Sequence, residues 1–525
     1  MAELKYPVGL QTFSEIITEN YLYVDKTEII YNLVNQSKYV FLSRPRRFGK
    51  SLLVSTLEAY FKGKKELFQN LAISSLESTW TEYPVFRFDF SGEYFNRLDI
   101  LIEHINGLLD DMEDQYGLEV TTGTISRRFN LILRKVYEKF GQRVVILIDE
   151  YDKPLLDCLH NDELHDNMRN QLAAFYSVMK AADKHIKFAM ITGVTRFSRV
   201  SIFSALNNLD DISMLPEYNA ICGISETEFH KYFPESIESF ASKHKLSAQE
   251  VWIAFRREYD GYRFAREGEF IYNPYSVLKA FRFKELGHYW FVSGSASFLV
   301  NLVKRHCFLL GDLEGAKRKA AELSDISSIG NDFVPLLYQG GYLTLKGYDP
   351  HTKEYTLGFP NHEVSEGFWE SLAREFFIDR IGNNCFSTVK FLDELYDGKP
   401  DAFMKRLKAL FADTESQSES NKEIHFQNMM AISCKMLGLT VHTEIRSSAG
   451  RCDMIIETLR YIYIFEFKVD GSAEEALAQI IKKDYAGRYG IDCRQIFLIG
   501  ANFSTTTRTL TTPWLIESLS TFEDE

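Results

Sequence analysis

The sequence predicts an α/β protein with a parallel sheet in its first part, a mainly helical middle part and a second α/β part at its C-terminal end. In the first part, continuous runs rich in Val, Ile and Leu alternate with amphipathic segments, as in βαβ units whose strands are buried on both faces. From about Glu226 the pattern becomes helical and aromatic. Near the C-terminal end strand-like runs return, with a helix from about Ala473 and a strand near residues 495–500.

Length and composition narrow the class of protein. At 525 residues the chain is too long for one core, so we expect roughly two to four domains. It has no run of about 18 apolar residues and no signal-peptide layout at its start, so we expect a cytoplasmic protein without membrane insertion. The seven cysteines are scattered, which fits free thiols and gives no zinc site. A net charge of −13 still allows a local basic groove for nucleic acid.

We divide the chain into four parts. Residues 1–225 form the parallel-sheet domain, with strands expected over residues 38–42, 85–90, 144–148 and 188–191. Residues 226–385 form a helical, winged-helix-like middle domain with a hairpin over 336–345 that turns at Gly340-Gly341. Residues 386–422 form a connecting helix and a polar linker over 412–421, which cannot bury enough surface to order itself. Residues 423–525 form the last domain, beginning with a helix over 423–437.

A phosphate-binding loop is expected between the first strand and the helix that starts near Lys50. Backbone N–H groups and the positive end of a helix can surround a phosphate there, Lys50 can neutralise it, and Ser51 can bind Mg²⁺. The first glycine of the usual pattern is replaced by Arg44, and a bare Gly-Lys-Ser/Thr arises by chance in roughly one chain in four of this length. The candidate nucleotide-binding residues of the loop are Arg44, Arg46, Arg47, Phe48, Gly49, Lys50, Ser51 and Leu52.

A second motif supports the loop. The apolar run 144–148 ends in Asp149-Glu150, which predicts Asp149 near the Mg²⁺ ion and Glu150 beside the attacking water. The alternative is a core strand followed by surface acids, with Lys50 in solvent. Because the two motifs occur in the right order and each at a strand end, nucleotide binding is favoured.

The strand over 188–191 is followed by a third candidate group. In ATPases with an extra strand between the loop strand and the acidic strand, a polar residue here contacts water or the γ-phosphate. Thr192 or Thr195 could do so, and Arg196 or Arg199 could sense phosphate or act across a subunit boundary. A glycine turn with a solvated arginine is an equal alternative.

The C-terminal part contains a candidate metal site. If Leu459-Arg460 form a two-residue hairpin loop, Asp453 lies opposite Glu466, and two carboxylates so close favour a divalent cation such as Mg²⁺. Lys468 lies on the same strand face and can orient water or stabilise charge on a phosphate. The alternative is an ion pair between Glu466 and Lys468 at a sheet edge, since about two Glu-x-Lys triplets arise by chance in this length.

These motifs together resemble a known bacterial family, found in gut anaerobes, that joins an AAA-ATPase-like domain to a PD-(D/E)XK nuclease-superfamily domain. The resemblance covers nearly the whole chain and also involves the segments at residues 6–9, 23–27, 148–154, 192–196 and 272–275, and Gln479. It implies a P-loop NTPase with a RecA/AAA-like sheet, a helical lid-like domain and a restriction-endonuclease-like domain. In this family an arginine is typical at position 44, and the resemblance implies that Glu423 joins Asp453 and Glu466 in the metal site.

The resulting hypothesis is an ATP-binding, ATP-hydrolysing protein with a Mg²⁺-dependent, or Mn²⁺-dependent, nuclease domain. Nucleic acid is the expected partner, with DNA favoured over RNA, and a homo-oligomer is an option because an arginine could act across subunits. The alternative is a nucleotide-dependent switch whose nuclease-like domain only binds nucleic acid or a protein. A pure interaction scaffold is disfavoured by Lys50-Ser51 and Asp149-Glu150.

Overall fold

The computed structural model describes residues 5–159, 161–196, 206, 208–292, 310, 313–324, 332–376, 393–411, 440–447, 450–489, 492–507 and 509–519. Contacts divide the chain into two compact units. Unit 1 holds Met1–Gly294, Lys317–Ile329 and Phe333–Val364, and unit 2 holds Ser295–Ala316, Gly330–Asp332 and Ser365–Glu525. The expected linker at 412–421, the expected helix at 423–437 and Arg199 lie outside the described residues.

Unit 1 is built on a five-stranded parallel sheet in the order β2-β3-β4-β1-β5. Its strands are β1 Tyr39–Ser43, β2 Val85–Asp89, β3 Val144–Asp149, β4 Ile186–Gly193 and β5 Asp210–Asp211. The three apolar runs and the segment at 85–90, which alternates apolar and polar residues, therefore form the strands predicted for them. Because β4 lies between β1 and β3, the extra strand expected between the loop strand and the acidic strand is present.

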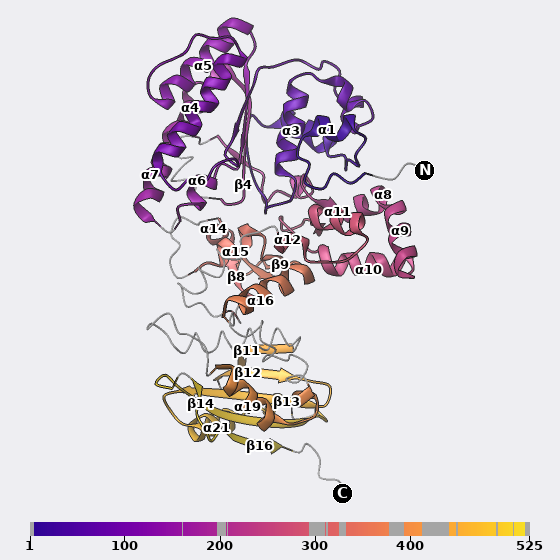
Figure 1. Ribbon diagram of the computed structural model, residues 1–525, viewed down its shortest axis with the longest axis vertical. Helices are drawn as coiled ribbons and strands as arrows, with labels where there is room; N and C mark the ends of the chain where they lie inside the picture. The colour runs from indigo at the N-terminus through magenta and orange to yellow at the C-terminus, as the bar shows by residue number, and fades with distance from the viewer. Residues whose placement is uncertain are drawn as a thin grey trace. The chain divides into compact units, whose positions relative to one another are not determined.

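Helices cover both faces of this sheet. Figure 1 shows α4 (Leu98–Gln115), α5 (Ile125–Phe140) and α7 (Asp162–Ala181) on one face, and α3 (Lys50–Phe61) with α1 (Phe13–Thr18) on the other. On the first face Phe88 of β2 makes edge contacts with a ring of α5 and a ring of α7, at centroid distances of 5.2 and 5.1 Å. The two covered faces explain why the strands read as continuous apolar runs.

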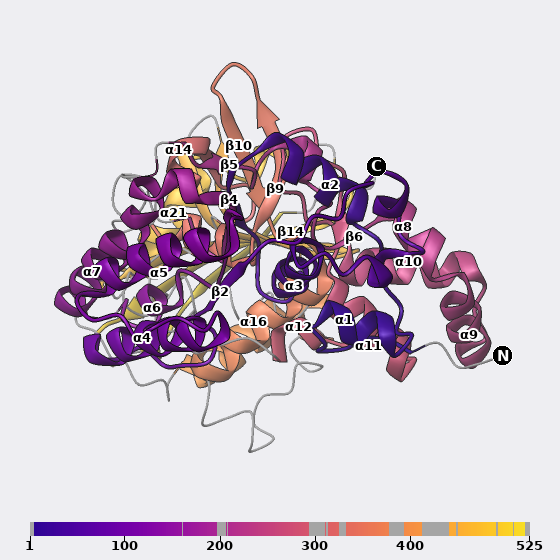
Figure 2. The same cartoon turned by 90° about the horizontal axis from the view of Figure 1, so that it is seen from above.

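A second, aromatic core belongs to the helical part of unit 1. It joins α8 (Glu226–Tyr232), α9 (Pro234–His244), α10 (Ala248–Tyr259) and α11 (Pro274–Phe283), and Figure 2 shows α8, α9 and α10 grouped beside the sheet. Phe229 stacks on Tyr272 at 4.7 Å, and Phe255 stacks on Phe281 at 4.3 Å. Capping boxes at Ser225 and Ser247 fix where α8 and α10 begin.

The hairpin predicted over residues 336–345 is wrong. These residues belong largely to the helix α15 (Val334–Gly340), and the hairpin lies further on, between β9 (Thr344–Asp349) and β10 (Glu354–Gly358). A proline in the first turn favours the helix, and Gly341 ends it in the left-handed conformation with φ of 89°. The two glycines therefore stop a helix instead of turning a hairpin.

Shorter elements complete unit 1. They are α2 Thr27–Gln36, α6 Lys153–Leu156, β6 Ile224–Ser225, β7 Ile271–Tyr272, α12 Tyr289–Val292, β8 Lys317–Lys319, α14 Ala320–Leu323 and 3-10 turns at Lys65–Phe68, Ala72–Ser75, Asp183–His185 and Pro216–Tyr218. The helix α16, His362–Phe376, begins in unit 1. Across the described parts of both units, no helix combines the length and the apolar character needed to cross a membrane.

Unit 2 is a mixed sheet in the order β11-β12-β13-β14-β15, with β16 also paired to β14. Its strands are β11 Thr440–Ser447, β12 Gly450–Glu457, β13 Tyr461–Val469, β14 Gln495–Ser504, β15 Thr509–Leu510 and β16 Leu515–Leu519. Among the strands that the structure describes in this unit, β13 and β14 are the one parallel pair, and α21 (Ala473–Lys482) with a 3-10 turn at Gly487–Tyr489 connects them. The α/β fold class predicted for both parts of the chain is confirmed.

Helices cover both faces of β13. Ile462 and Ile464 pack in one core with Leu477 of α21, whereas Phe465 contacts Phe403 of α19 (Pro400–Phe411) at a ring distance of 6.0 Å. The sequence interpretation had assigned α19 to the connection before the last domain. In unit 2 it packs against the sheet, with the Lys408 carbonyl accepting a bond from Thr509 at 3.0 Å.

Candidate functional site

The loop between β1 and α3 has the backbone of a phosphate cradle. Gly49 precedes the first helical residue, Lys50, and adopts φ of 95°, while Arg47 adopts φ of 67°. These left-handed residues turn the chain so that the first N–H groups of α3 lie at the loop, where they favour an anion. Ser51 and Leu52 are half-buried in the first turn of α3.

Lys50 is buried inside this loop, with 6% of its surface exposed. Its Nζ donates to the carbonyl oxygens of Arg44, at 2.9 Å, and Pro45, at 3.0 Å. Burial lowers the pKa of Lys50, and the nearby carboxylates of Glu150 and Asp149 act in the opposite direction. The alternative of a solvent-exposed lysine is therefore wrong.

Asp149 and Glu150 meet this lysine at the carboxyl end of the sheet. Asp149 is buried at the end of β3, and its Oδ1 accepts a bond from Thr192 Oγ1 of β4 at 2.6 Å. Glu150 is half-buried with φ of 53°, and burial raises its pKa while Lys50 opposes the rise. Because the strands are parallel, their ends bring together Lys50, Asp149, Glu150 and Thr192, as the sequence motifs predict.

Asp152 is a buried acid of this site to which the sequence interpretation gave no role. Its Oδ2 accepts from the N–H groups of Val194, at 3.0 Å, and Thr195, at 2.6 Å, and from the Thr195 hydroxyl. Burial raises the pKa of Asp152. The carboxylate therefore fixes the segment that follows β4, including Thr195, whose hydroxyl is already engaged. The position of Asp152, two residues after Glu150, was the one feature of the sequence that could have indicated this role.

Arg44 occupies a structural position. It is 1% exposed, and its guanidinium donates to the carbonyl oxygens of Ser43, Ser213 and Tyr218 at 2.8–2.9 Å. The guanidinium also lies 4.2 Å from the ring centre of Phe264. Its side chain thus holds the loop onto the segment after β5, so a role in nucleotide binding falls to its backbone.

The other loop residues divide into exposed and packed side chains. Arg46 and Arg47 are exposed, and the guanidinium of Arg47 lies 4.9 Å from the ring centre of Tyr275. Phe48 is buried between the rings of Tyr262 and Phe264, at 4.7 and 5.4 Å. Phe48 therefore anchors the loop, whereas the two arginines remain accessible to a ligand.

Arg196 is held within unit 1. Its side chain pairs with Asp211 of β5, and its N–H donates to Gln339 Oε1 at 2.6 Å. The arginine side chain is only 15% exposed, so the alternative of a solvated arginine is wrong. Sensing of phosphate by Arg196 requires that it leave Asp211, and this role stays a prediction.

In unit 2 the register of β12 and β13 is the one expected from a two-residue loop. Met454 pairs with Phe465 and Glu457 with Ile462, and the Thr458 N–H donates to the Tyr461 carbonyl at 2.9 Å, which closes the loop at Leu459-Arg460. The register ends at the pair Met454–Phe465, one position before Asp453 and Glu466. Asp453 Oδ2 accepts from the Phe467 N–H at 2.8 Å, and the charge of Asp453 acts on the Glu466 carboxyl. The two carboxyl groups are therefore neighbours, while their direct pairing stays a prediction.

Glu466 is the buried centre of this second site. It is 2% exposed, and its Oε1 accepts from Lys468 Nζ at 3.3 Å and from the amide of Gln479 on α21. Gln479 Oε1 in turn accepts from Lys468 Nζ at 2.6 Å. From the sequence, Gln479 was expected on a helix suited to approach a nucleic-acid backbone. In the structure it bridges the acid and the lysine.

The other oxygen of Glu466 is buried and has no hydrogen-bond partner among the residues that the structure describes. Burial, and then the neighbouring charge of Asp453, raise the pKa of Glu466 to about 7. An orphaned carboxylate oxygen beside a second carboxylate fits a hard divalent cation. The alternative was an ion pair between Glu466 and Lys468 at a sheet edge. The ion pair is present, but β13 lies between β12 and β14, so it is not at an edge. Glu423 lies outside the described residues.

Comparisons with known proteins identify the families of the two α/β parts. A family described as "Predicted AAA-ATPase" matches residues 7–203, and the PD-(D/E)XK nuclease superfamily matches residues 421–512. An uncharacterized protein encoded in the vnfD 5′ region of Azotobacter chroococcum mcd 1 is 35% identical, over 99% of this chain and 100% of that protein. The chain belongs to the AAA-ATPase-like family with a C-terminal PD-(D/E)XK nuclease-superfamily domain.

A solved structure is also similar to this AAA-ATPase-like chain. The Orc1 protein of Aeropyrum pernix, in complex with DNA, shares 10% identity with a TM-score of 0.26, covering 70% of this chain and 97% of that one. A similarity this low supports no conclusion. The family matches confirm the resemblance seen in the sequence, while the roles of individual site residues stay predictions.

The raised pKa of Glu466 predicts how pH affects the stability of metal-free unit 2. A carboxyl whose pKa rises on folding stabilises the folded state fully at pH values below its pKa in the unfolded state, 4.5. This contribution is lost as the pH rises through the pKa in the folded state, about 7. In EDTA at pH 8 we expect Glu466→Gln to raise the free energy of unfolding, by up to about 3 kcal/mol. At pH 5 the gain should be much smaller.

Calorimetric unfolding at both pH values measures this difference. Glu474→Gln, which replaces an exposed acid in the first turn of α21, is the matched control and should change neither value. Equal melting temperatures of wild type and Glu466→Gln at pH 8 would contradict the prediction.

Proposed function

We propose that this protein binds and hydrolyses ATP with Mg²⁺ at the carboxyl end of the unit 1 sheet, and that its C-terminal domain is a Mg²⁺-dependent nuclease. The observation that carries the nuclease proposal is the orphaned, buried oxygen of Glu466 beside Asp453 and Lys468. The observation that carries the ATPase proposal is the convergence of Lys50 with Asp149 and Glu150.

In the nucleotide site each side chain has one proposed role. Lys50 neutralises the β- and γ-phosphate oxygens, and Ser51 with Asp149 would hold Mg²⁺. Glu150 accepts a proton from the attacking water, a role favoured by burial that raises its pKa. Thr192, bonded to Asp149 at 2.6 Å, keeps that carboxylate in place, which is a positioning role.

In the nuclease site Asp453 and Glu466 would hold Mg²⁺ or Mn²⁺, and Glu423 completes the set that the family implies. The cation would supply a water of lowered pKa and charge stabilisation at the phosphate. Lys468 stabilises the negative charge that grows as water attacks phosphorus and the P–O bond to the leaving oxygen breaks. Gln479 positions Lys468 through its bond of 2.6 Å.

A nucleic-acid partner follows from the nuclease proposal, and we favour DNA over RNA. The described cysteines Cys158, Cys222 and Cys493 are free thiols, which supports a reducing, cytoplasmic location. A homo-oligomer stays part of the proposal, because Arg196, or Arg199 outside the described residues, could act on a nucleotide in a neighbouring copy.

A second candidate function is a nucleotide-dependent switch whose nuclease-like domain only binds nucleic acid or a protein. The observation in its favour is that Lys468 is engaged by both Glu466 and Gln479, so it must be partly released before it reaches a phosphate. Metal binding without cleavage of any nucleic acid would favour this second function.

Lys50→Ala should abolish ATP binding, because it removes the charge that faces the β- and γ-phosphates. Calorimetric titration of the full chain with Mg²⁺–ATP measures the affinity. Lys62→Ala is the matched control, since Lys62 follows the last turn of the same helix and pairs with Glu58. Equal affinities of Lys50→Ala and wild type would refute the phosphate role.

Glu150→Gln should separate binding from turnover. Loss of the general base should slow hydrolysis on the order of 10²-fold or more, while ATP stays bound. Phosphate release is measured beside the titration, with Glu163→Gln on the exposed start of α7 as control. Unchanged turnover would show that another group activates the water.

Variants of the nuclease site should separate metal binding from cleavage. Asp453→Ala should lose both, whereas Lys468→Ala should keep the metal and lose cleavage, because a lysine cannot bind Mg²⁺ but can stabilise a phosphate. Cleavage of single-stranded DNA, duplex DNA and RNA is followed with and without ATP, and Mn²⁺ binding is measured by titration. Lys482→Ala, exposed on α21, is the control. Cleavage by Lys468→Ala at the wild-type rate would exclude its proposed role.

A further inference from the structure

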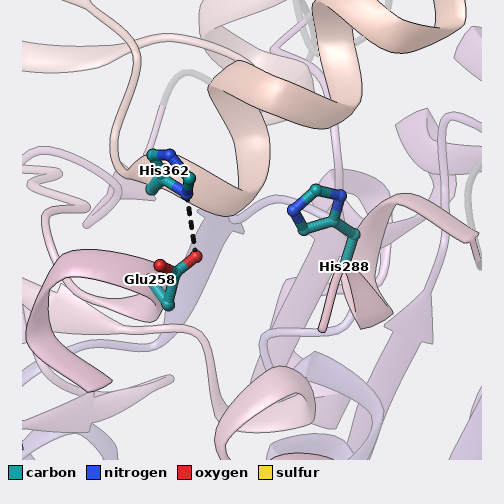
Figure 3. Close-up of side chains that lie close together, drawn as sticks. All are labelled: Glu258, His288 and His362. Carbon is teal, nitrogen blue, oxygen red and sulfur yellow. Dashed lines mark hydrogen bonds and ion pairs between the residues drawn. The ribbon is translucent and has the colours of Figure 1, made fainter. Parts of the chain in front are cut away.

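A cluster of metal-ligating side chains lies in unit 1, formed by the last turn of α10, the residue before α12 and the first residue of α16. It consists of Glu258, His288 and His362, and one ligand atom from each lies within 4.8 Å of the others. Figure 3 shows a ring nitrogen of His288 turned toward the gap between the other two side chains. We propose that these three residues bind a divalent transition-metal ion of the zinc type.

The donor set decides the class of ion. Two imidazole nitrogens and one carboxylate oxygen suit zinc, cobalt or nickel, whereas Mg²⁺ and Ca²⁺ prefer oxygen ligands alone. Three protein ligands leave a coordination position for water, and the cluster is open on one side because His362 is exposed and His288 is half-buried. The site therefore differs in chemistry from the proposed nucleotide and nuclease sites, whose ligands are all oxygen atoms.

The carboxylate of Glu258 is already oriented for such an ion. Arg257 donates to its Oε1 from Nε, at 2.9 Å, and from Nη2, at 2.7 Å. Its other oxygen, Oε2, lies 3.0 Å from Nδ1 of His362. A second side chain that fixes one carboxylate oxygen and leaves the other for the cation is the usual support of a metal site.

The three backbone segments are also fixed against one another, each close to a ligand. The hydroxyl of Tyr259 donates to the Gly287 carbonyl at 3.1 Å and accepts from the Gly287 N–H at 2.9 Å, which joins the segments of Glu258 and His288. The Trp290 N–H donates to Glu363 Oε1 at 2.6 Å, which joins the segments of His288 and His362.

The third connection is a close backbone approach. A Cβ added at Gly261 would lie 2.1 Å from the Pro360 carbonyl oxygen, so only glycine allows the end of α10 to pass the chain before α16. Gly261 has φ of 108°, which also favours glycine. The three ligands therefore meet on a preformed frame, and binding needs small side-chain movements without rearrangement of the chain.

The simpler explanation of the cluster is a hydrogen-bonded pair of Glu258 and His362, with His288 nearby. This pair does not explain why a ligand atom of His288 lies within 4.8 Å of ligand atoms of the other two residues. A metal site predicts instead that replacement of either histidine weakens binding of the same ion.

Cobalt(II) is the probe, because its visible absorption reports tetrahedral nitrogen and oxygen coordination. The full chain, stripped with EDTA and dialysed, is titrated with CoCl₂ in excess MgCl₂, so that Mg²⁺ occupies the oxygen-ligand sites. We expect one equivalent of Co²⁺ with a tetrahedral spectrum that ZnCl₂ displaces. Either His288→Gln or His362→Gln should weaken Co²⁺ binding more than about 10-fold.

His351→Gln is the matched control, because His351 is exposed in the turn between β9 and β10 of the same unit, and it should bind Co²⁺ as the wild type does. Since His362 is exposed, its replacement leaves the buried core intact, and circular dichroism checks that the variant folds. The proposal is overturned if the wild type shows no tetrahedral Co²⁺ spectrum, or if both histidine variants bind Co²⁺ with the wild-type affinity. A loss in the two cluster variants alone supports it.

Discussion

The buried guanidinium of Arg44 is the interaction on which the arrangement of unit 1 depends. A charge with 1% exposure must find polar partners nearby, and it finds three backbone carbonyls, two of which belong to the segment after β5. Burial lowers its pKa to about 10, so it stays protonated at neutral pH. The ring of Phe264 lies beside this guanidinium, and Phe48 packs against Phe264. The helical part begins with α8, a few residues after Tyr218. The loop is thereby fixed between the sheet and the helices.

Much of the fold could be predicted from the sequence because its signals are local. Three apolar runs and one alternating segment formed β1 to β4, and counting back from Leu459-Arg460 gave the register observed from Glu457–Ile462 to Met454–Phe465. Signals that depend on tertiary structure were missed. The two-residue strand β5 has no periodicity to detect, and Gly340-Gly341 reads equally as a turn or as a helix end. Only the preceding proline, which suits a first helical turn, separates these alternatives.

The candidate sites show the same division. Lys50, Asp149 and Glu150 lie in sequence motifs that indicate their chemical roles. Gln479 is only one of several polar residues on an amphipathic helix, and its role became visible when the structure placed α21 beside Glu466. Arg44 and Arg196 looked like surface or phosphate-binding arginines, and their buried partners come from residues more than a dozen positions away. The histidines of the cluster at Glu258 are separated by 74 positions, from 288 to 362, so no ligand spacing could reveal them.

The two carbonyl bonds of Lys50 have a consequence for nucleotide affinity. In this conformation the carbonyl oxygens of Arg44 and Pro45 compete with a phosphate for the ammonium group of Lys50. With the phosphate role proposed for Lys50, the apparent affinity for a nucleotide equals the intrinsic affinity multiplied by the fraction of molecules whose lysine is released. Any contact that strains those two carbonyls, even far from the phosphates, would tighten binding without touching the ligand. Under this proposal the loop sets the nucleotide concentration at which half of the molecules are occupied.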